Sequence, residues 1–309
     1  MYKRQGKYNI KKSNGYLLKG IRERVELISR LSKEHSIKLL CKVLKVARST
    51  YYSILNHKAS NREIENNILK SKIFKVYCDN RKVYGSIKIT RILRDNGYPK
   101  LSVNRVSRLM KQLGIRSITI RKFKNYRNKQ NEHSELKNLV NQNFSAQKPN
   151  QIWLSDITYI HTIKHGWTYL ASVLDVCTRK IVGYSYGRKM DRSLVISALT
   201  NSWQNQNYPN NVILHSDRGS QYTSSEYIAA AERMGFRLSY SKKGCPFDNA
   251  PMESFHSVLK KEEVYLKHYS SFYEANIRLF DYINGFYNLN RIHSAINYLS
   301  PIHFEKSLL

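Results

Sequence analysis

The sequence predicts an α/β protein in which a mixed five-stranded sheet is flanked by helices and preceded by an all-helical region. Two observations predict this fold class. Apolar residues alternate with polar ones as in strands over 152–162, 167–176 and 181–187. Before residue 120, by contrast, apolar residues recur at helical spacing. A strand meander followed by alternating helices and strands is typical of a mixed sheet covered by helices.

The remaining elements of the second half follow from the same patterns. We expect short strands over 212–215 and 237–241, and helices over 191–206, 224–234, 249–266 and 272–289. One arrangement that these elements allow has the fourth strand beside the first.

The first half contains two candidate helix-turn-helix pairs. After an expected helix over 21–31, residues 36–55 fit two helices, with Ser49 as the cap of the second. A charged helix over 61–78 precedes helices over 86–96 and 102–113, with Ser102 as an N-cap and Gly114 as the terminating residue. An ordinary helical hairpin is the alternative for the first pair.

Four segments are expected along the chain. They are a helix-turn-helix region at 1–60, a second helical DNA-binding region at 61–120, a basic linker at 121–148, and a catalytic core with C-terminal helices at 149–309. In the linker, basic residues alternate with Phe123 and Tyr126, a pattern that suits either contact with a nucleic-acid strand or a solvated tether.

Positive charge is concentrated in the first half. Residues 1–150 contain 36 Lys and Arg against 9 Asp and Glu, a balance of +27, whereas residues 151–309 contain 17 against 13, a balance of +4. This asymmetry indicates a polyanion-binding region, and nucleic acid is the expected partner. Candidate DNA contacts are Arg48 and, on the outward face of the last helix, Arg105, Arg108 and Lys111. A helix face that is merely exposed to solvent would carry the same pattern of basic residues.

Other classes of protein are disfavoured by composition. No run of about 18 apolar residues occurs, and residues 1–12 lack the apolar stretch of a secretory signal, so we expect a cytoplasmic location and no membrane partner. The four cysteines, at 41, 78, 177 and 245, have no metal-binding spacing and suit a reducing compartment.

Three carboxylates occupy positions that favour chemistry. Asp156 lies within an otherwise mostly apolar strand, Asp217 ends the fourth strand, and Glu253 lies early in a long helix after Asp248 and Asn249. If the fourth strand lies beside the first, the two aspartates converge and the helix brings Glu253 over them. Three hard oxygen donors suit Mg²⁺, and a two-metal site could activate water or a 3′-hydroxyl. Each acid alone is more often a cap or an ion-pair partner.

Four stretches resemble a known family. They are Pro149-Asn-Gln-Ile-Trp-Leu-Ser-Asp156, His215-Ser-Asp217-Arg-Gly-Ser-Gln-Tyr, Pro246-Phe-Asp-Asn-Ala-Pro-Met-Glu253-Ser-Phe, and the segment from Tyr287 to Pro301. With thirty-five residues between Asp217 and Glu253, the chain resembles the OrfB products of the IS-three family of insertion-sequence transposases, which are related to retroviral integrases. Residues 83–114 resemble the family's upstream helix-turn-helix.

The resemblance implies an RNase-H-like fold and a DDE transposase that cleaves and joins DNA at insertion-element ends. It implies Asp156, Asp217 and Glu253 as catalytic metal ligands for Mg²⁺ or Mn²⁺, in two ions, and Lys260 as a contact to terminal DNA. Expected partners are double-stranded DNA at element ends and target, further copies of the chain on DNA, and an OrfA product or an OrfA–OrfB fusion. The protein would then associate with the nucleoid when bound to DNA.

Two departures and two alternatives accompany this interpretation. No His/Cys zinc domain precedes the core, and His256 stands where a second aromatic residue is expected, a change expected to affect local packing only. Arg291 and His293 could contact DNA or the rim of the active site. The alternative functions are an RNase-H-fold nuclease without joining activity and a non-catalytic DNA-binding regulator.

Overall fold

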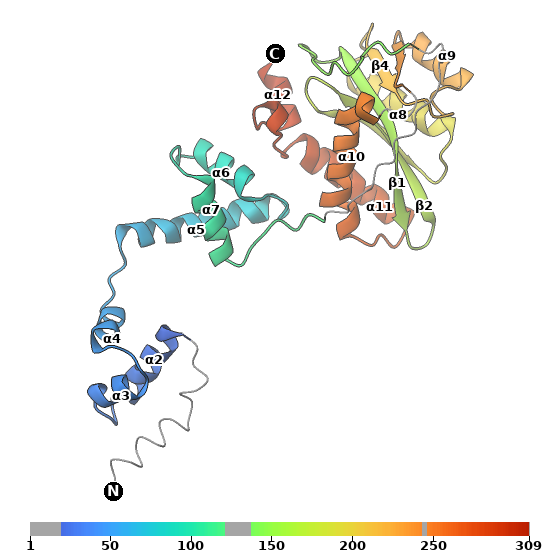
Figure 1. Ribbon diagram of the computed structural model, residues 1–309. Coiled ribbons are helices and arrows are strands. Elements are labelled where there is room, and N and C mark those ends of the chain that lie inside the picture. The colour runs from blue at the N-terminus through green and yellow to red at the C-terminus, as the bar shows by residue number, and fades with distance from the viewer. Residues whose placement is uncertain (1–19, 121–136, 243–245, 309) are drawn as a thin grey trace. The chain divides into compact units, whose positions relative to one another are not determined.

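The computed structural model describes residues 20–120, 137–242 and 246–308 (Figure 1). The expected alternation around Phe123 and Tyr126 lies outside the described residues. The chain divides into two compact units, Met1–Leu69 and Lys70–Leu309, and each has a hydrophobic core of its own. No described helix is long and apolar enough to cross a membrane.

Three short helices form the first unit: α2 (Ile21–Leu31), α3 (Ile37–Val43) and α4 (Arg48–Leu55). Ile28 and Leu40 are fully buried in their shared core. Between α3 and α4 the chain turns at Lys45, whose φ of 53° is left-handed. Residues 36–55 therefore form two helices joined by a tight turn, as expected.

The start of α4 differs from the expectation. Its N-cap is Ala47 and not Ser49, and no side chain caps the helix. The physical reason is the left-handed turn at Lys45, which completes the change of direction early and allows the helix to begin at Arg48. Arg48, a candidate DNA contact, is consequently the first residue of α4 and is exposed.

A second set of helices comprises α5 (Asn61–Asp79), α6 (Ser86–Asp95) and α7 (Val103–Gln112). The Oγ of Ser102 accepts a hydrogen bond from the backbone N–H of Arg105 at 3.2 Å, which confirms the expected N-cap of α7. Gly97, between α6 and α7, has a φ of +95°, a conformation that glycine adopts without steric cost. The α6–α7 pair is therefore terminated and restarted by the residues that the sequence indicated.

The second unit contains a five-stranded sheet. Its strands are β1 (Ile152–Thr162), β2 (Gly166–Asp175), β3 (Ile181–Gly187), β4 (Ile213–Ser216) and β5 (Arg237–Tyr240), in the order β3-β2-β1-β4-β5. The first three strands are antiparallel neighbours, whereas β4 runs parallel to β1 and β5 parallel to β4. This is the strand order of an RNase-H-like fold, and it confirms that the fourth strand lies beside the first.

One face of this sheet is covered by α8 (Arg192–Asn205) and α9 (Ser225–Arg233). The core on this face joins strand residues such as Trp153 and Leu214 to Leu199 of α8 and Tyr227 of α9. At Gly183 the backbone of β3 approaches Ser202 of α8 so closely that no β-carbon would fit. The close approach explains why glycine occupies this strand position.

The opposite face carries the C-terminal helices, which begin with η1 (Pro246–Asn249), α10 (Ala250–Glu262) and η2 (Val264–Leu266). The helix expected over 249–266 is thus interrupted, because Glu263 leaves helical geometry with φ −133° and ψ −64°. There follow α11 (Phe272–Phe280), a π-helical continuation η3 (Asp281–Asn288), η4 (Ser294–Ile296) and α12 (Pro301–Ser307).

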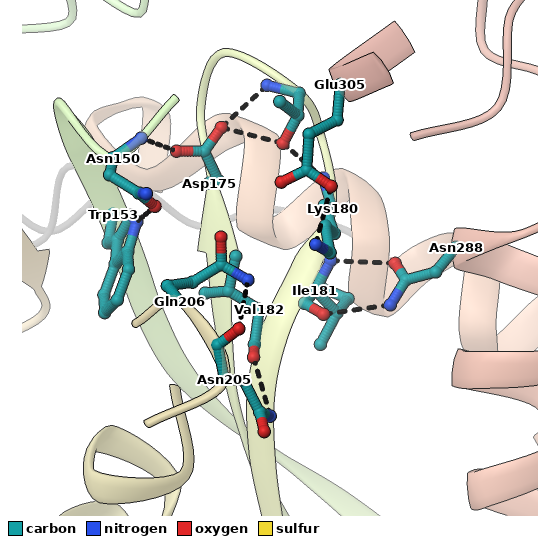
Figure 2. Close-up of polar contacts among 11 residues, drawn as sticks. Asn150, Trp153, Asp175, Lys180, Ile181, Val182, Asn205, Gln206, Asn288 and Glu305 are labelled. Carbon is teal, nitrogen blue, oxygen red and sulfur yellow. Dashed lines mark hydrogen bonds and ion pairs between the residues drawn. The ribbon is translucent and has the colours of Figure 1, made fainter. Parts of the chain in front are cut away.

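Polar contacts join these C-terminal segments to β3 and to the turn before it (Figure 2). The Asn288 amide donates to the carbonyl of Ile181 and accepts from its N–H, both at 2.9 Å, and Lys180 contacts Glu305 at 2.7 Å. Asp175, at the end of β2, accepts hydrogen bonds from the neighbouring turn and from the N–H of Asn150. Asp175 therefore has a structural role.

Candidate active site

Asp156 lies in β1, and Asp217 lies directly after the end of the neighbouring strand β4. Ser155 of β1 pairs with Ser216 of β4 in the parallel ladder, and each is followed directly by one of the aspartates. Adjacent strands are about 4.8 Å apart, so the ladder brings the two residues close together. Ser155 contacts Tyr222 in the core beneath α8 and α9. Because side chains alternate along a strand, Asp156 lies on the opposite face.

The electrostatics of Asp217 reflect this proximity. Burial raises the pKa of Asp217, and the nearby charge of Asp156 raises it further. The backbone N–H of Gly219 opposes both effects by donating to the Asp217 carboxylate at 3.0 Å. A nearby cation would favour the charged form of the Asp217 carboxylate.

Glu253 approaches the same face from α10, where it lies in the first helical turn and is half-buried. The start of this helix is tied to β1, because the side-chain amide of Asn249 donates to the carbonyl of Ser155 at 3.4 Å. Asn249 occupies the N-cap position, but its side chain does not cap the helix. Asn249 therefore connects the start of α10 to the strand that bears Asp156.

Sequence reasoning missed the contact that His256 makes with Asp156. Its Nδ1 lies 3.4 Å from Oδ2 of Asp156, and only 7% of the residue is exposed. The departure from an aromatic residue was expected to alter packing only, yet the ring reaches the candidate catalytic aspartate. The available signal was helical spacing, since residues three apart share a helix face and His256 follows Glu253 by three.

Asp156, Asp217 and Glu253 have side chains that suit a divalent cation, but the three do not form a complete cluster. Carboxylates are the oxygen ligands that Mg²⁺ and Mn²⁺ prefer, and Asp156 in β1 and Asp217 directly after β4 are two carboxylates at neighbouring positions. Among the residues that the structure describes, no three His, Cys, Asp or Glu side chains lie close enough together to hold a metal ion. The structure thus brings the two aspartates together without completing a three-residue cluster with Glu253.

A buried polar framework supports the loops around these acids. His215 contacts Ser239 at 2.8 Å and Ser241 at 3.0 Å, and burial lowers its pKa to about 4. Asp248, just before α10, accepts from the N–H of Lys242 at 2.8 Å and from the side chain of Gln142 at 2.8 Å. The framework links β4, β5 and the segment that leads to Glu253.

The expected DNA contacts occupy varied surroundings. Arg108 and Lys111 of α7 are exposed, as expected, whereas Arg105 is half-buried because it lies at the start of the helix behind its cap. Lys260 lies on α10 and is half-buried. Arg291 is only 7% exposed and pairs with Glu262, so it is not available at a DNA-facing surface.

Family models match most of the described chain. Integrase core domain models match residues 146–246 and 253–309, and an HTH-like domain model matches residues 63–123. The transposase for insertion sequence element IS904 of Lactococcus lactis is 39% identical over 82% of this chain and 99% of its own. The transposase InsF for insertion sequence IS3A of Escherichia coli is 37% identical over 91% of this chain and 98% of its own.

The chain belongs to the IS3 family of insertion-sequence transposases. Its enzyme class is therefore that of the polynucleotidyl transferases that move insertion elements. The integrase core models cover the two regions that contain Asp156, Asp217 and Glu253. The HTH-like model covers α6 and α7, with Arg105, Arg108 and Lys111.

Solved structures of retroviral integrases are similar in part. The catalytic core domain of HTLV-2 integrase in complex with magnesium matches 52% of this chain and 99% of its own, with 15% identity and a TM-score of 0.41. A simian T-cell lymphotropic virus intasome in complex with a PP2A regulatory subunit matches 75% of this transposase, with 14% identity and a TM-score of 0.42.

Proposed function

We propose that this transposase uses Asp156, Asp217 and Glu253 as ligands for two divalent ions, Mg²⁺ or Mn²⁺, and that the loaded site both cleaves and joins DNA. The observation that carries the proposal is the pairing of Ser155 with Ser216, because each of these serines directly precedes one of the two aspartates. The contact of His256 with Asp156 supports it further, because it shows that α10, the helix of Glu253, packs over the same face.

Each of the three acidic residues has its own task at the site. Asp156 and Asp217 supply oxygen ligands from the sheet, and Glu253 completes the set from the helix above. When bound, a pair of such ions activates a water or a DNA 3′-hydroxyl and stabilises the leaving oxygen of the phosphodiester. The protein contributes positioning, since the sheet fixes two ligands and α10 carries the third.

The partners of the site are also part of the proposal. Double-stranded DNA at the element ends is the substrate, with α7 and α4 as candidate contacts through Arg108, Lys111 and Arg48. We expect copies of the chain to assemble on DNA, and an OrfA product, or a fusion with it, to complete the active transposase. A transposase that acts on chromosomal DNA is expected in the cytoplasm, where it would associate with the nucleoid when bound to DNA.

The test is an in vitro assay with labelled element ends, target DNA, Mg²⁺ and OrfA supplied in trans or fused. Asp156→Asn, Asp217→Asn and Glu253→Gln should each abolish nicking and joining, because each removes the charge of one metal ligand. Glu232→Gln, at an exposed carboxylate on α9, should retain activity and serves as the matched control.

The alternatives make different forecasts in the same assay. A wild-type protein that nicks the ends but never produces a joined strand would favour the nuclease. The non-catalytic regulator would be favoured if the protein binds the ends and none of the three substitutions changes its binding or its transposition phenotype.

A further inference from the structure

We propose that His256 is a positioning residue of the active site, which orients the Asp156 carboxylate for the cation. The inference rests on the proposed role of Asp156 as a metal ligand. Its starting point is the 3.4 Å contact between Nδ1 of His256 and Oδ2 of Asp156. The ring comes from α10, so the contact joins the helix of Glu253 to the strand of Asp156.

Both oxygens of Asp156 have a protein neighbour. Oδ1 accepts a hydrogen bond from the N–H of Ile157 at 2.7 Å, and Oδ2 faces the imidazole of His256. Each carboxylate oxygen has two lone pairs, so one neighbour on each leaves capacity for a cation. Neighbours on both sides fix the rotation of the carboxylate, and groups behind a metal ligand orient it in this way.

The second ring nitrogen indicates a polar role for His256. His256 is more than nine-tenths buried, and its Nε2 has no hydrogen-bond partner among the described residues. Buried polar atoms without partners are rare and costly, so an apolar ring would pack more favourably here. A histidine is therefore better explained by the approach of its Nδ1 to the Asp156 carboxylate than by packing.

Asn249 repeats this arrangement one helical turn before Glu253. Its Nδ2 donates to the carbonyl of Ser155, next to Asp156, while its Oδ1 is buried without a partner among the described residues. Two buried residues of the α10 segment thus direct one polar atom each at the Ser155–Asp156 stretch of β1. Asn249 contacts the backbone next to Asp156, and His256 contacts the Asp156 carboxylate, so the two residues together hold both parts of the proposed ligand in position.

The geometry requires a defined tautomer. For Nδ1 to donate to Asp156, the neutral ring carries its proton on Nδ1, and Nε2 is then an acceptor. Asparagine can present a side-chain N–H close to the position of Nδ1, whereas phenylalanine keeps the ring volume and its packing against Phe255 but offers no donor. His256→Phe and His256→Asn therefore separate the donor from the ring.

The experiment measures Mn²⁺ binding to the full chain by titration followed with electron paramagnetic resonance, without DNA. His256→Phe should weaken Mn²⁺ binding about tenfold, the lower end of the usual effect of losing a group behind a metal ligand. His256→Asn should stay within about threefold of the wild type. Thermal unfolding should be similar for all of them, and His268→Phe, at an exposed histidine, is the matched control.

A second readout is the Mg²⁺ concentration that gives half-maximal cleavage. It should rise with His256→Phe by a factor similar to the loss of Mn²⁺ affinity, while the rate at saturating Mg²⁺ changes less. Wild-type affinity in a folded His256→Phe protein, or equal losses in His256→Phe and His256→Asn, would overturn the positioning role alone. If Asp156→Asn leaves Mn²⁺ binding unchanged, the proposed function and this inference fail together.

Discussion

Glu262 and Arg291 form a buried, two-pronged ion pair. Nε of Arg291 donates to Oε2 of Glu262 and Nη2 donates to Oε1, both at 2.8 Å. Glu262 is the last residue of α10, and Arg291 follows the π-helical segment. The hydroxyl of Tyr282 donates to the same carboxylate at 2.9 Å. The pair therefore holds the end of the helix that carries Glu253 against the C-terminal segments.

Removal of one partner should be strongly destabilising. Arg291→Met leaves the Glu262 carboxylate buried without its counter-charge, so the free energy of unfolding should fall by about 3–5 kcal/mol. Urea denaturation followed by circular dichroism measures the loss. The double variant Glu262→Leu with Arg291→Met should recover much of it, because no charge is then left unpaired. A single variant as stable as the wild type would contradict the buried pairing.

Lys88 of α6 should make stability depend on pH. Burial lowers the pKa of Lys88 to about 7 from 10.5, and the charge of Arg291 lowers it further, while the carboxylate of Glu262 opposes them. The ring of Tyr84, 4.6 Å from Nζ, favours the charged amine but does not outweigh burial. His293 nearby stays neutral at pH 7, because burial and neighbouring cations lower its pKa to about 2.

The sign follows from the two protonation states. Between about pH 7 and pH 10.5 the unfolded chain holds a proton on Lys88 that the folded protein has lost, so the free energy of unfolding rises with pH over that window. Lys88→Met removes the titrating group and should flatten the rise. Urea denaturation at several pH values compares the two slopes, and equal slopes would show that Lys88 is not the source.

The basic face of α7 should contribute to DNA affinity through phosphates. Arg108 and Lys111 are exposed on this helix. If each contacts one phosphate, Arg108→Ala and Lys111→Ala should each reduce the slope of log affinity against log salt by about 0.9. Equilibrium binding of the full chain to duplex DNA at several salt concentrations measures the slope. Lys75→Ala, at an exposed lysine of α5, should leave it unchanged.

The strands could be predicted closely from the sequence because each carries a local pattern. The bounds of β1 and β3 agree with the expected ranges, and Ser102 caps α7 as expected. The sequence also placed Asp217 at the end of the fourth strand, and Ser216, directly before it, pairs with Ser155 of β1.

The features that escaped prediction depend on contacts between distant segments. His256 looks like a packing substitution until α10 is seen against Asp156, and no local pattern states what a helix face will meet. The break at Glu263 was not predicted either, because no glycine or proline marks it in the sequence. Arg291 appeared available for DNA since its partner, Glu262, is remote in sequence.

Substitution of Lys260 should affect DNA binding without affecting metal binding. Lys260 lies seven residues after Glu253 on α10, almost two turns further along nearly the same face, a rise of about 10 Å. A cation at that distance is too far to touch an ion held by Glu253, but it can hold a neighbouring phosphate. Lys260→Ala should therefore weaken binding of terminal DNA and reduce strand transfer while Mn²⁺ affinity stays unchanged.

The assay combines filter binding of labelled element ends, strand transfer in Mg²⁺, and Mn²⁺ titration on the same protein preparations. Lys260→Arg should restore part of the DNA binding because it restores the charge, and Lys164→Ala, at an exposed lysine between β1 and β2, is the matched control. Loss of Mn²⁺ affinity in Lys260→Ala would mean that Lys260 supports the metal site itself. Unchanged end binding and joining would remove Lys260 from the DNA interface, because a phosphate contact cannot be lost without a change in affinity.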